Sequence, residues 1–138
     1  MRRNSHSPTK VNTLNQRSYF DWGNNMQVIR KGNGDIVMTE SELVRFFGVT
    51  WKKLNHRLQL LMKSSNLHPN EREAGEEGVF LNGRLQGYAP LYSLSIIIAL
   101  SFQLDSMEAH LFRKYVCTAM QRPTSAITPI LLIGNKYN

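Results

Sequence analysis

The chain has a single cysteine, Cys117, and no long hydrophobic run. One cysteine excludes an internal disulfide framework and is typical of a reducing compartment. The most apolar segment, Leu91 to Leu104, is interrupted by serine and glutamine and is shorter than the roughly 20 apolar residues of a membrane span. No secretory signal is visible. We therefore predict a soluble, cytoplasmic protein without a membrane partner, and we expect Cys117 to be a buried hydrophobe on a helix.

Metal-binding and catalytic motifs are also absent. The four histidines show no metal-ligand spacing, and Cys117 has no partner nearby in the sequence. The segment Gly32–Gly34 lacks the third glycine and the following helix of a dinucleotide fingerprint, and no serine has the flanking glycines of a nucleophile elbow. We predict that the chain is not an enzyme and that it binds no cofactor and no metal.

Positive charge is present in excess. The 138 residues fit one domain with one core, and their formal net charge is +7 at pH 7. Such a charge favours an anionic partner, nucleic acid before an acidic membrane surface. Many basic proteins bind nothing anionic, however, so the position of the charge along the chain has to decide.

The two ends of the chain differ from its middle. Residues 1–17 are polar and basic, and we predict a flexible arm that either follows a nucleic-acid backbone or is a solvated tail. Residues 18–122 are predicted to form the folded domain. Residues 123–138 form an apolar tail, in which Ile127 to Ile133 either folds back on the core or meets another subunit. The arm's basic residues are Arg2, Arg3, Lys10 and Arg17.

Glycine-containing turns bound the predicted strands. Short strands are expected at Met26–Arg30 and Asp35–Met38, on either side of a turn at residues 31–34. Asn82-Gly83 suits a two-residue type I′ turn, which predicts a hairpin over Val79–Gln86. The hairpin's extension places Pro90 toward a sheet edge.

A polar loop and two helices are predicted in the second half. Residues 66–78 form the loop, whose acidic cluster would repel phosphate and should point away from DNA. Ser93 can cap a buried helix that runs to Leu104; Asp105 or Ser106 can cap a last helix that Pro123 ends. The acidic cluster is Glu71, Glu73, Glu76 and Glu77, and the apolar stripe of the last helix is Leu111, Phe112, Tyr115, Val116, Ala119 and Met120.

Residues 39–61 have the pattern of a helix-turn-helix. Thr39 and Glu42 have the spacing of a capping box that starts a short helix. Gly48 follows where the backbone needs a conformation that glycine adopts at low cost. Val49 is expected to be buried in the turn, and Thr50 to cap a second, longer helix. This arrangement is the one that DNA-binding helix-turn-helix proteins use.

The second helix has an apolar face and a basic face. With Leu54 pointing inward, Leu58, Leu61 and Trp51 lie within about 60° of it. The outer face carries Lys52, Asn55, His56, Gln59 and Lys63, with Arg57 at one flank.

The charged residues around this helix are all basic. Between Glu42 and Glu71 the sequence contains five Lys or Arg residues and no acid, and phosphate contacts dominate affinity for DNA. An ordinary solvated helix face is the alternative. The predicted DNA-binding residues are Thr50, Lys52, Lys53, Asn55, His56, Arg57, Gln59, Lys63 and, at the hairpin tip, Arg84.

These residues suit different roles. Asn55 and Gln59 suit bidentate bonds to adenine, and Lys52 and His56 suit guanine or phosphate. Thr50 suits a phosphate at the helix N-terminus. Lys53 and Arg57 suit backbone positioning, as does Arg84 if the hairpin is a wing; a purely structural hairpin is equally compatible with the sequence.

The segment from Tyr92 to Tyr115 resembles the bacterial RhuM-type "virulence protein" family, whose pattern is close to Y-N-L-x-x-I-I-A-V-G-Y-R-V-x-S-x-x-A-x-x-F-R-x-W-A. The resemblance extends upstream to Leu43–Thr50 and covers about Ile36 to Met120. The chain departs from the pattern at Ser101, Gln103 and Tyr115–Val116. The matching residues are Tyr92, Leu94, Ile97, Ile98, Ala99, Ser106, Ala109, Phe112 and Arg113.

The resemblance implies a DNA-binding module without a defined operator or catalytic step. Most of the matching residues nevertheless suit a core, with Arg113 pairing to Asp105, Glu108 or a helix carbonyl. The motif therefore supports the fold more directly than a DNA contact.

Together these patterns predict an α+β fold: a helix-turn-helix with a β-hairpin wing, winged-helix-like, followed by two packed C-terminal helices. The predicted function is double-stranded DNA binding by a transcriptional regulator, with a homodimer through the last helix and the tail. A protein-interaction or scaffold module, in which the helix-turn-helix is only structural, is the main alternative. An RNA-binding protein is the third reading and an enzyme the last.

Overall fold

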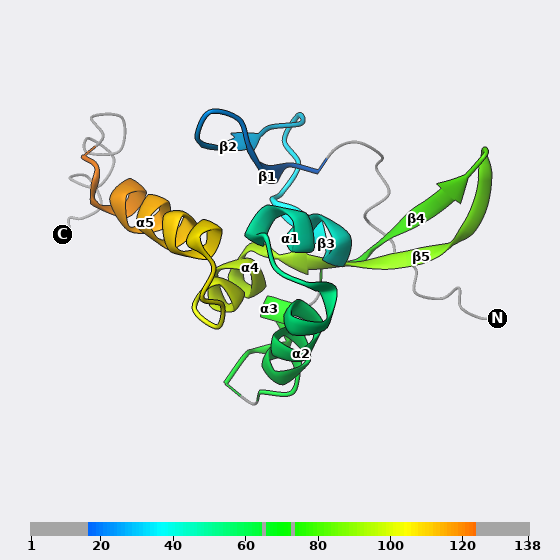
Figure 1. Cartoon of the computed structure of the whole chain (residues 1–138). Helices are drawn as coiled ribbons and strands as arrows, with labels where there is room; N and C mark the ends of the chain where they lie inside the picture. The colour runs from blue at the N-terminus through cyan, green and yellow to red at the C-terminus, as the bar shows by residue number, and fades with distance from the viewer. Residues whose placement is uncertain (1–16, 65, 73, 124–138) are drawn as a thin grey trace, which may run out of the picture.

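Five helices and two small antiparallel sheets make up residues 17–64, 66–72 and 74–123, which the computed structural model describes (Figure 1). The mixed α+β class is as predicted, and the expectations for residues 1–16 and 124–138 lie outside the described residues. The strands are β1 (Tyr19–Trp22), β2 (Met26–Ile29), β3 (Val37–Thr39), β4 (Glu76–Leu81) and β5 (Arg84–Ser93). The helices are α1 (Glu40–Phe47), α2 (Trp51–Met62), α3 (Pro69–Arg72), α4 (Leu94–Ser101) and α5 (Met107–Gln121).

The two strands predicted around residues 31–34 exist, but they do not pair with each other. β2 pairs with β1, and β3 pairs with β5, more than fifty residues further along the chain. The fully buried Ser18 explains the difference. Its hydroxyl accepts a hydrogen bond from the Lys31 amide and donates one to the Gly34 carbonyl, both at 3.1 Å. Its backbone amide donates to the Asp35 carbonyl oxygen and its carbonyl oxygen accepts from the Val37 amide, so Ser18 occupies the place beside residues 35–37 that β2 would take in a hairpin.

The second sheet has the strand order β3-β5-β4 and contains the predicted hairpin. Asn82 and Gly83 have φ values of 54° and 79°, the positive pair that a type I′ turn requires. Pro90 pairs with Glu76 of β4, and β3 ends opposite Leu91, so the other side of Pro90 is at a sheet edge as expected. Glu76 and Glu77 belong to β4, so the predicted polar loop ends earlier than residue 78.

An aromatic cluster forms the centre of the core. Phe20 of β1 lies against Phe46 of α1 and Phe112 of α5, with ring centroids 5.7 and 4.8 Å apart. Phe47 packs edge-on against Phe112. Because three elements that are distant in sequence contribute to this cluster, it joins β1, α1 and α5 into one body.

The C-terminal helices begin as predicted but leave more apolar surface exposed than predicted. Ser93 caps α4 and Ser106 caps α5. Of the α5 stripe, Phe112 is fully buried, whereas Tyr115 and Met120 are exposed. The prediction that Cys117 is buried is wrong, since its side chain is exposed. Helical periodicity places these residues on faces of α5, but only the neighbouring elements decide which face is covered.

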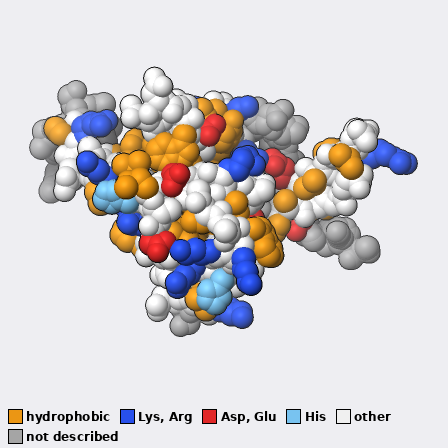
Figure 2. All heavy atoms as spheres, in the orientation of Figure 1, with side chains coloured by type: hydrophobic (Ala, Val, Ile, Leu, Met, Phe, Trp, Pro, Cys, Tyr) orange, Lys and Arg blue, Asp and Glu red, His pale blue; other side chains and the backbone are white. Residues whose placement is uncertain are grey.

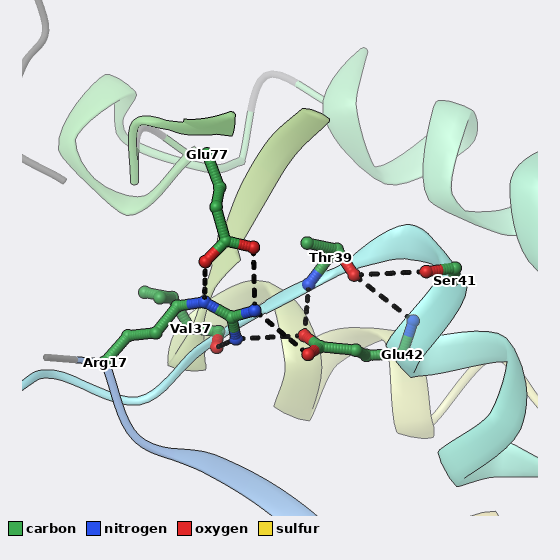
Figure 3. Close-up of polar contacts among 6 residues, drawn as sticks. All are labelled: Arg17, Val37, Thr39, Ser41, Glu42 and Glu77. Carbon is green, nitrogen blue, oxygen red and sulfur yellow. Dashed lines mark hydrogen bonds and ion pairs between the residues drawn. The ribbon is translucent and has the colours of Figure 1, made fainter. Parts of the chain in front are cut away.

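Arg17 is not part of a flexible arm (Figure 3). Its guanidinium donates hydrogen bonds to both carboxylate oxygens of Glu42, at 3.0 and 2.9 Å, and to both of Glu77, at 2.6 and 2.9 Å. It also donates to the Val37 carbonyl oxygen at 3.2 Å. A bidentate fork of this kind suits arginine alone among the basic side chains. Arg17 thus connects α1, β3 and β4.

Burial and pairing act in opposite directions on this cluster. Burial alone would raise the pKa of Glu42, but hydrogen bonds from Arg17 and the Thr39 amide lower it below its ordinary value of 4.5. Burial would likewise lower the pKa of Arg17, and the two carboxylates raise it. Both groups are therefore charged at neutral pH.

We predict that Arg17→Met lowers the free energy of unfolding by about 2–3 kcal/mol. The loss stays below that of a fully buried pair because Glu77 is partly solvated. Arg17→Lys, which keeps the charge without the fork, should lose about 1 kcal/mol. Urea denaturation at pH 7 measures both, and equal stability of the wild type and Arg17→Met would contradict the assignment.

The same pair should show a defined pH dependence. A lowered carboxyl pKa stabilises the fold fully above pH 4.5 and ceases to do so as the pH falls through the folded-state pKa of Glu42. The stability gap between the wild type and Arg17→Met should therefore narrow as the pH is lowered below 4.5. A gap that stays constant from pH 7 to pH 3 would argue against the role of Glu42.

Candidate nucleic-acid interface

The α1–turn–α2 segment has the local geometry that the sequence predicts. Thr39 and Glu42 form both hydrogen bonds of the capping box, at 3.3 and 2.9 Å. Gly48 ends α1 in the left-handed conformation with φ 62°. The Thr50 hydroxyl accepts a hydrogen bond from the Lys53 amide at 3.1 Å and caps α2. The two helices are therefore joined by a turn whose conformation is set by nearby residues.

The inner face of α2 is narrower than predicted. Leu54 and Leu58 are fully buried, where α2 packs against α1 and α4, and Leu61 is half-buried. The prediction that Trp51 points inward is wrong, because its side chain is 59% exposed. Trp51 lies in the first turn and about 60° from Leu54, outside the strip that the two neighbouring helices cover.

The outer face of α2 is open and basic. Lys52, His56, Gln59 and Lys63 are exposed, and within the described part of the chain their side chains form no hydrogen bond or ion pair. Lys, Arg and His side chains gather over α2 on the face seen in Figure 2. Arg57 is half-buried at the flank, as expected. The outer face of α2 is therefore open to solvent.

Two of the predicted DNA-binding residues already have acidic partners. The Asn55 amide Nδ2 donates to the Glu40 carboxylate at 2.8 Å, and Lys53 Nζ lies 2.7 Å from an Asp105 oxygen. The hydrogen bond from Lys53 and then its charge lower the pKa of Asp105, to which Arg57 also contributes. The region that is free of acids in sequence is thus bordered by two acids in space.

Sequence reasoning missed Glu40 and Asp105 as neighbours of α2. They are 15 and 52 residues away from their partners, and no helical or strand spacing relates them. The cap before α5 brings Asp105 to α2, and the first turn of α1 brings Glu40. They divide the predicted site into free residues and residues that are already engaged.

Arg84 lies apart from α2, at the exposed end of the β4–β5 hairpin, which projects from the body in Figure 1. The hairpin also exposes large apolar side chains: Phe80 is 64% and Leu81 60% exposed. Phe80 and Leu85 pair across the strands and would both contact a Cβ at Gly78, so they lie on one face. The hairpin is therefore an apolar ribbon with a basic tip.

Comparisons with protein-family models, with curated proteins and with solved structures find no match for this chain. The residues of the Tyr92–Tyr115 segment on which the expected resemblance rests lie mostly in the core. Ile97 and Phe112 are fully buried and Tyr92 is nearly so. Arg113 donates to the carbonyl oxygens of Ser101 and Leu104, the helix-carbonyl role among those expected.

Two other findings bear on the chemistry of the described residues. No helix among them has both the length and the apolar sequence needed to cross a bilayer. No group of three or more His, Cys, Asp or Glu side chains in the same ranges is arranged to hold a metal ion.

We predict that Gly48→Ala lowers the free energy of unfolding by about 1–2 kcal/mol, because φ 62° is strained for any residue with a Cβ. The new Cβ would also lie 2.7 Å from the Glu108 carboxyl, which must move. Gly83→Ala is the comparison variant: its φ is also positive but nothing lies within 4 Å, so it should lose stability from backbone strain alone, and Gly48→Ala should lose at least as much. Thermal unfolding compares the two; a neutral Gly48→Ala would refute the strain argument.

Proposed function

We propose that the protein binds double-stranded DNA through the outer face of α2 and acts as a transcriptional regulator rather than an enzyme. The observation that carries the proposal is the exposed row Lys52, His56, Gln59 and Lys63, which no other described element covers. A helix on a glycine turn with an open basic face is suited to the major groove.

The contacts divide by chemistry. Lys52, Arg57 and Lys63 would contact phosphates. Gln59 offers a hydrogen-bond donor and an acceptor that complement the acceptor and the donor on the edge of adenine. Asn55 offers the same pair, but one of its amide hydrogens is used by Glu40. Gln59 is therefore the stronger candidate for reading a base.

The β4–β5 hairpin is proposed as a wing. It follows α2 in the chain, and its tip carries Arg84 while both acids of β4 lie at its base. Because Glu77 is paired to Arg17, little negative charge opposes phosphate at the tip. Arg84 would then contact the DNA backbone without discriminating between base sequences.

We predict that affinity for a short duplex falls steeply with salt. With about four to six phosphate contacts, the slope of log affinity against log salt should be near −4 to −5. Lys52→Ala/Arg57→Ala should make the slope shallower by about 2. Fluorescence anisotropy with a labelled duplex measures both.

The matched control is Arg30→Ala/Lys31→Ala, which removes two exposed charges at the end of β2, on the opposite side of the molecule from α2 in Figure 1. This variant should keep the wild-type slope. If both double variants change the slope equally, binding reflects net charge and not α2, and the proposal fails.

Asp105 should act against DNA binding because it holds Lys53 and adds negative charge beside α2. Asp105→Asn should raise duplex affinity about 2–5-fold at low salt, and the gain should shrink as salt screens the charge. Asp35→Asn removes one exposed acid near β2 and serves as the control. An unchanged affinity for Asp105→Asn would mean that Lys53 stays out of the interface.

A protein-interaction module is the second candidate, favoured by the apolar ribbon of the hairpin. Phe80 and Leu81 are exposed to an extent that commonly marks a contact surface. Phe80→Ser/Leu81→Ser separates the candidates. Unchanged duplex affinity would place this apolar surface outside the DNA interface, as a protein-interaction surface requires, and weakened affinity would place the hairpin in the DNA interface.

A further inference from the structure

A groove lies between the β1–β2 sheet and α5. Trp22 and Met26 form one wall, and Leu111 and Tyr115 of α5 form the other. The groove has a volume of about 240 Å³ and a largely apolar surface. Asn25, Lys114 and Thr118 complete the lining. It differs from the α2 face in both position and chemistry.

The walls of this groove are only partly covered. Leu111 is 41% and Tyr115 38% exposed, although both belong to the apolar stripe of α5. In Figure 2, hydrophobic side chains gather between β1–β2 and α5. A two-stranded sheet is marginal by itself. The β1–β2 sheet packs on the core through Phe20, while its side with Trp22 and Met26 is only partly covered.

We propose that the apolar segment Ile127–Ile133 of the same chain packs into this groove. The segment contains five isoleucine or leucine residues and one proline, with no charged residue. Its aliphatic side chains match the Trp22, Met26, Leu111 and Tyr115 walls. It would bury these walls and hold the β1–β2 sheet against α5.

The connection is long enough. α5 ends at Gln121, and its groove-lining residues lie up to ten residues back, about 15 Å along the helix axis. Residues 122–126, which link α5 to the segment, span at most about 17 Å. Pro123 cannot continue the helix, so the chain is free to turn back.

The chain's own segment is favoured over that of a second copy. A linker of five residues gives the segment a millimolar effective concentration at the groove. The receiving wall is also firm, because the Trp22 indole nitrogen donates to the Phe46 carbonyl oxygen at 2.7 Å. The groove therefore holds its form without an induced fit of Trp22.

Trp22 gives a direct readout in the full chain. Trp51→Phe removes the only other tryptophan, which is exposed, and leaves Trp22 as the reporter. In this background, Leu131→Asp/Leu132→Asp should raise the acrylamide quenching constant of Trp22 at least twofold. Hydrogen exchange of the β2 amides should accelerate about tenfold. Asn135→Asp/Asn138→Asp adds the same charges outside the apolar segment and should change neither.

Three results decide the matter. Monomer mass by light scattering together with the expected Trp22 response supports the proposal. A dimer that the Leu131→Asp/Leu132→Asp variant dissolves would assign the groove to a second copy and overturn it. Unchanged quenching and exchange in β2 would also overturn it, provided that exchange in α2 shows the fold intact. None of these readouts depends on DNA.

Discussion

The ion cluster around Arg17 holds α1, β3 and the β4–β5 hairpin in their relative positions. One guanidinium holds the capping carboxylate of α1, a carboxylate at the base of the hairpin and a carbonyl of β3. Glu42 is half-buried, and without Arg17 its charge would be uncompensated. Glu42 also caps the N-terminus of α1, and Gly48 sets the direction of the chain from α1 into α2. The cluster therefore orients the proposed DNA-binding helix relative to the hairpin.

The charge of the candidate interface is decided by contacts between distant residues. A segment without acidic residues in the sequence lies beside two acidic side chains in the fold, Glu40 and Asp105. Each of them pairs with a residue of α2. Among the residues that the structure describes, the outer face of α2 therefore carries both unpaired residues and residues that already have acidic partners. Lys52, Gln59 and Lys63 are open, whereas Lys53 and Asn55 would have to exchange a protein partner for a nucleic-acid one. The proposed affinity therefore depends mainly on the open residues.

The aromatic core buries only some of the chain's apolar side chains. Phe20, Phe46 and Phe112 enclose one another, while the hairpin and one side of α5 remain exposed. The motif residues Ile97 and Phe112 belong to the enclosed part, and Arg113 caps the end of α4. The motif thus accounts for stability, and the proposed functions rest on surfaces outside it.

Four local features follow from residue type and spacing in the chain: the Thr39–Glu42 capping box, the left-handed Gly48, the Thr50 cap and the Asn82–Gly83 turn. Each depends on atoms within about four residues, so spacing and residue type suffice. Packing between distant elements sets the partner of β2, the exposure of Trp51 and Cys117, and the ion pairs of Arg17. These depend on burial and on charges 25 and 60 residues away, which local periodicity does not encode.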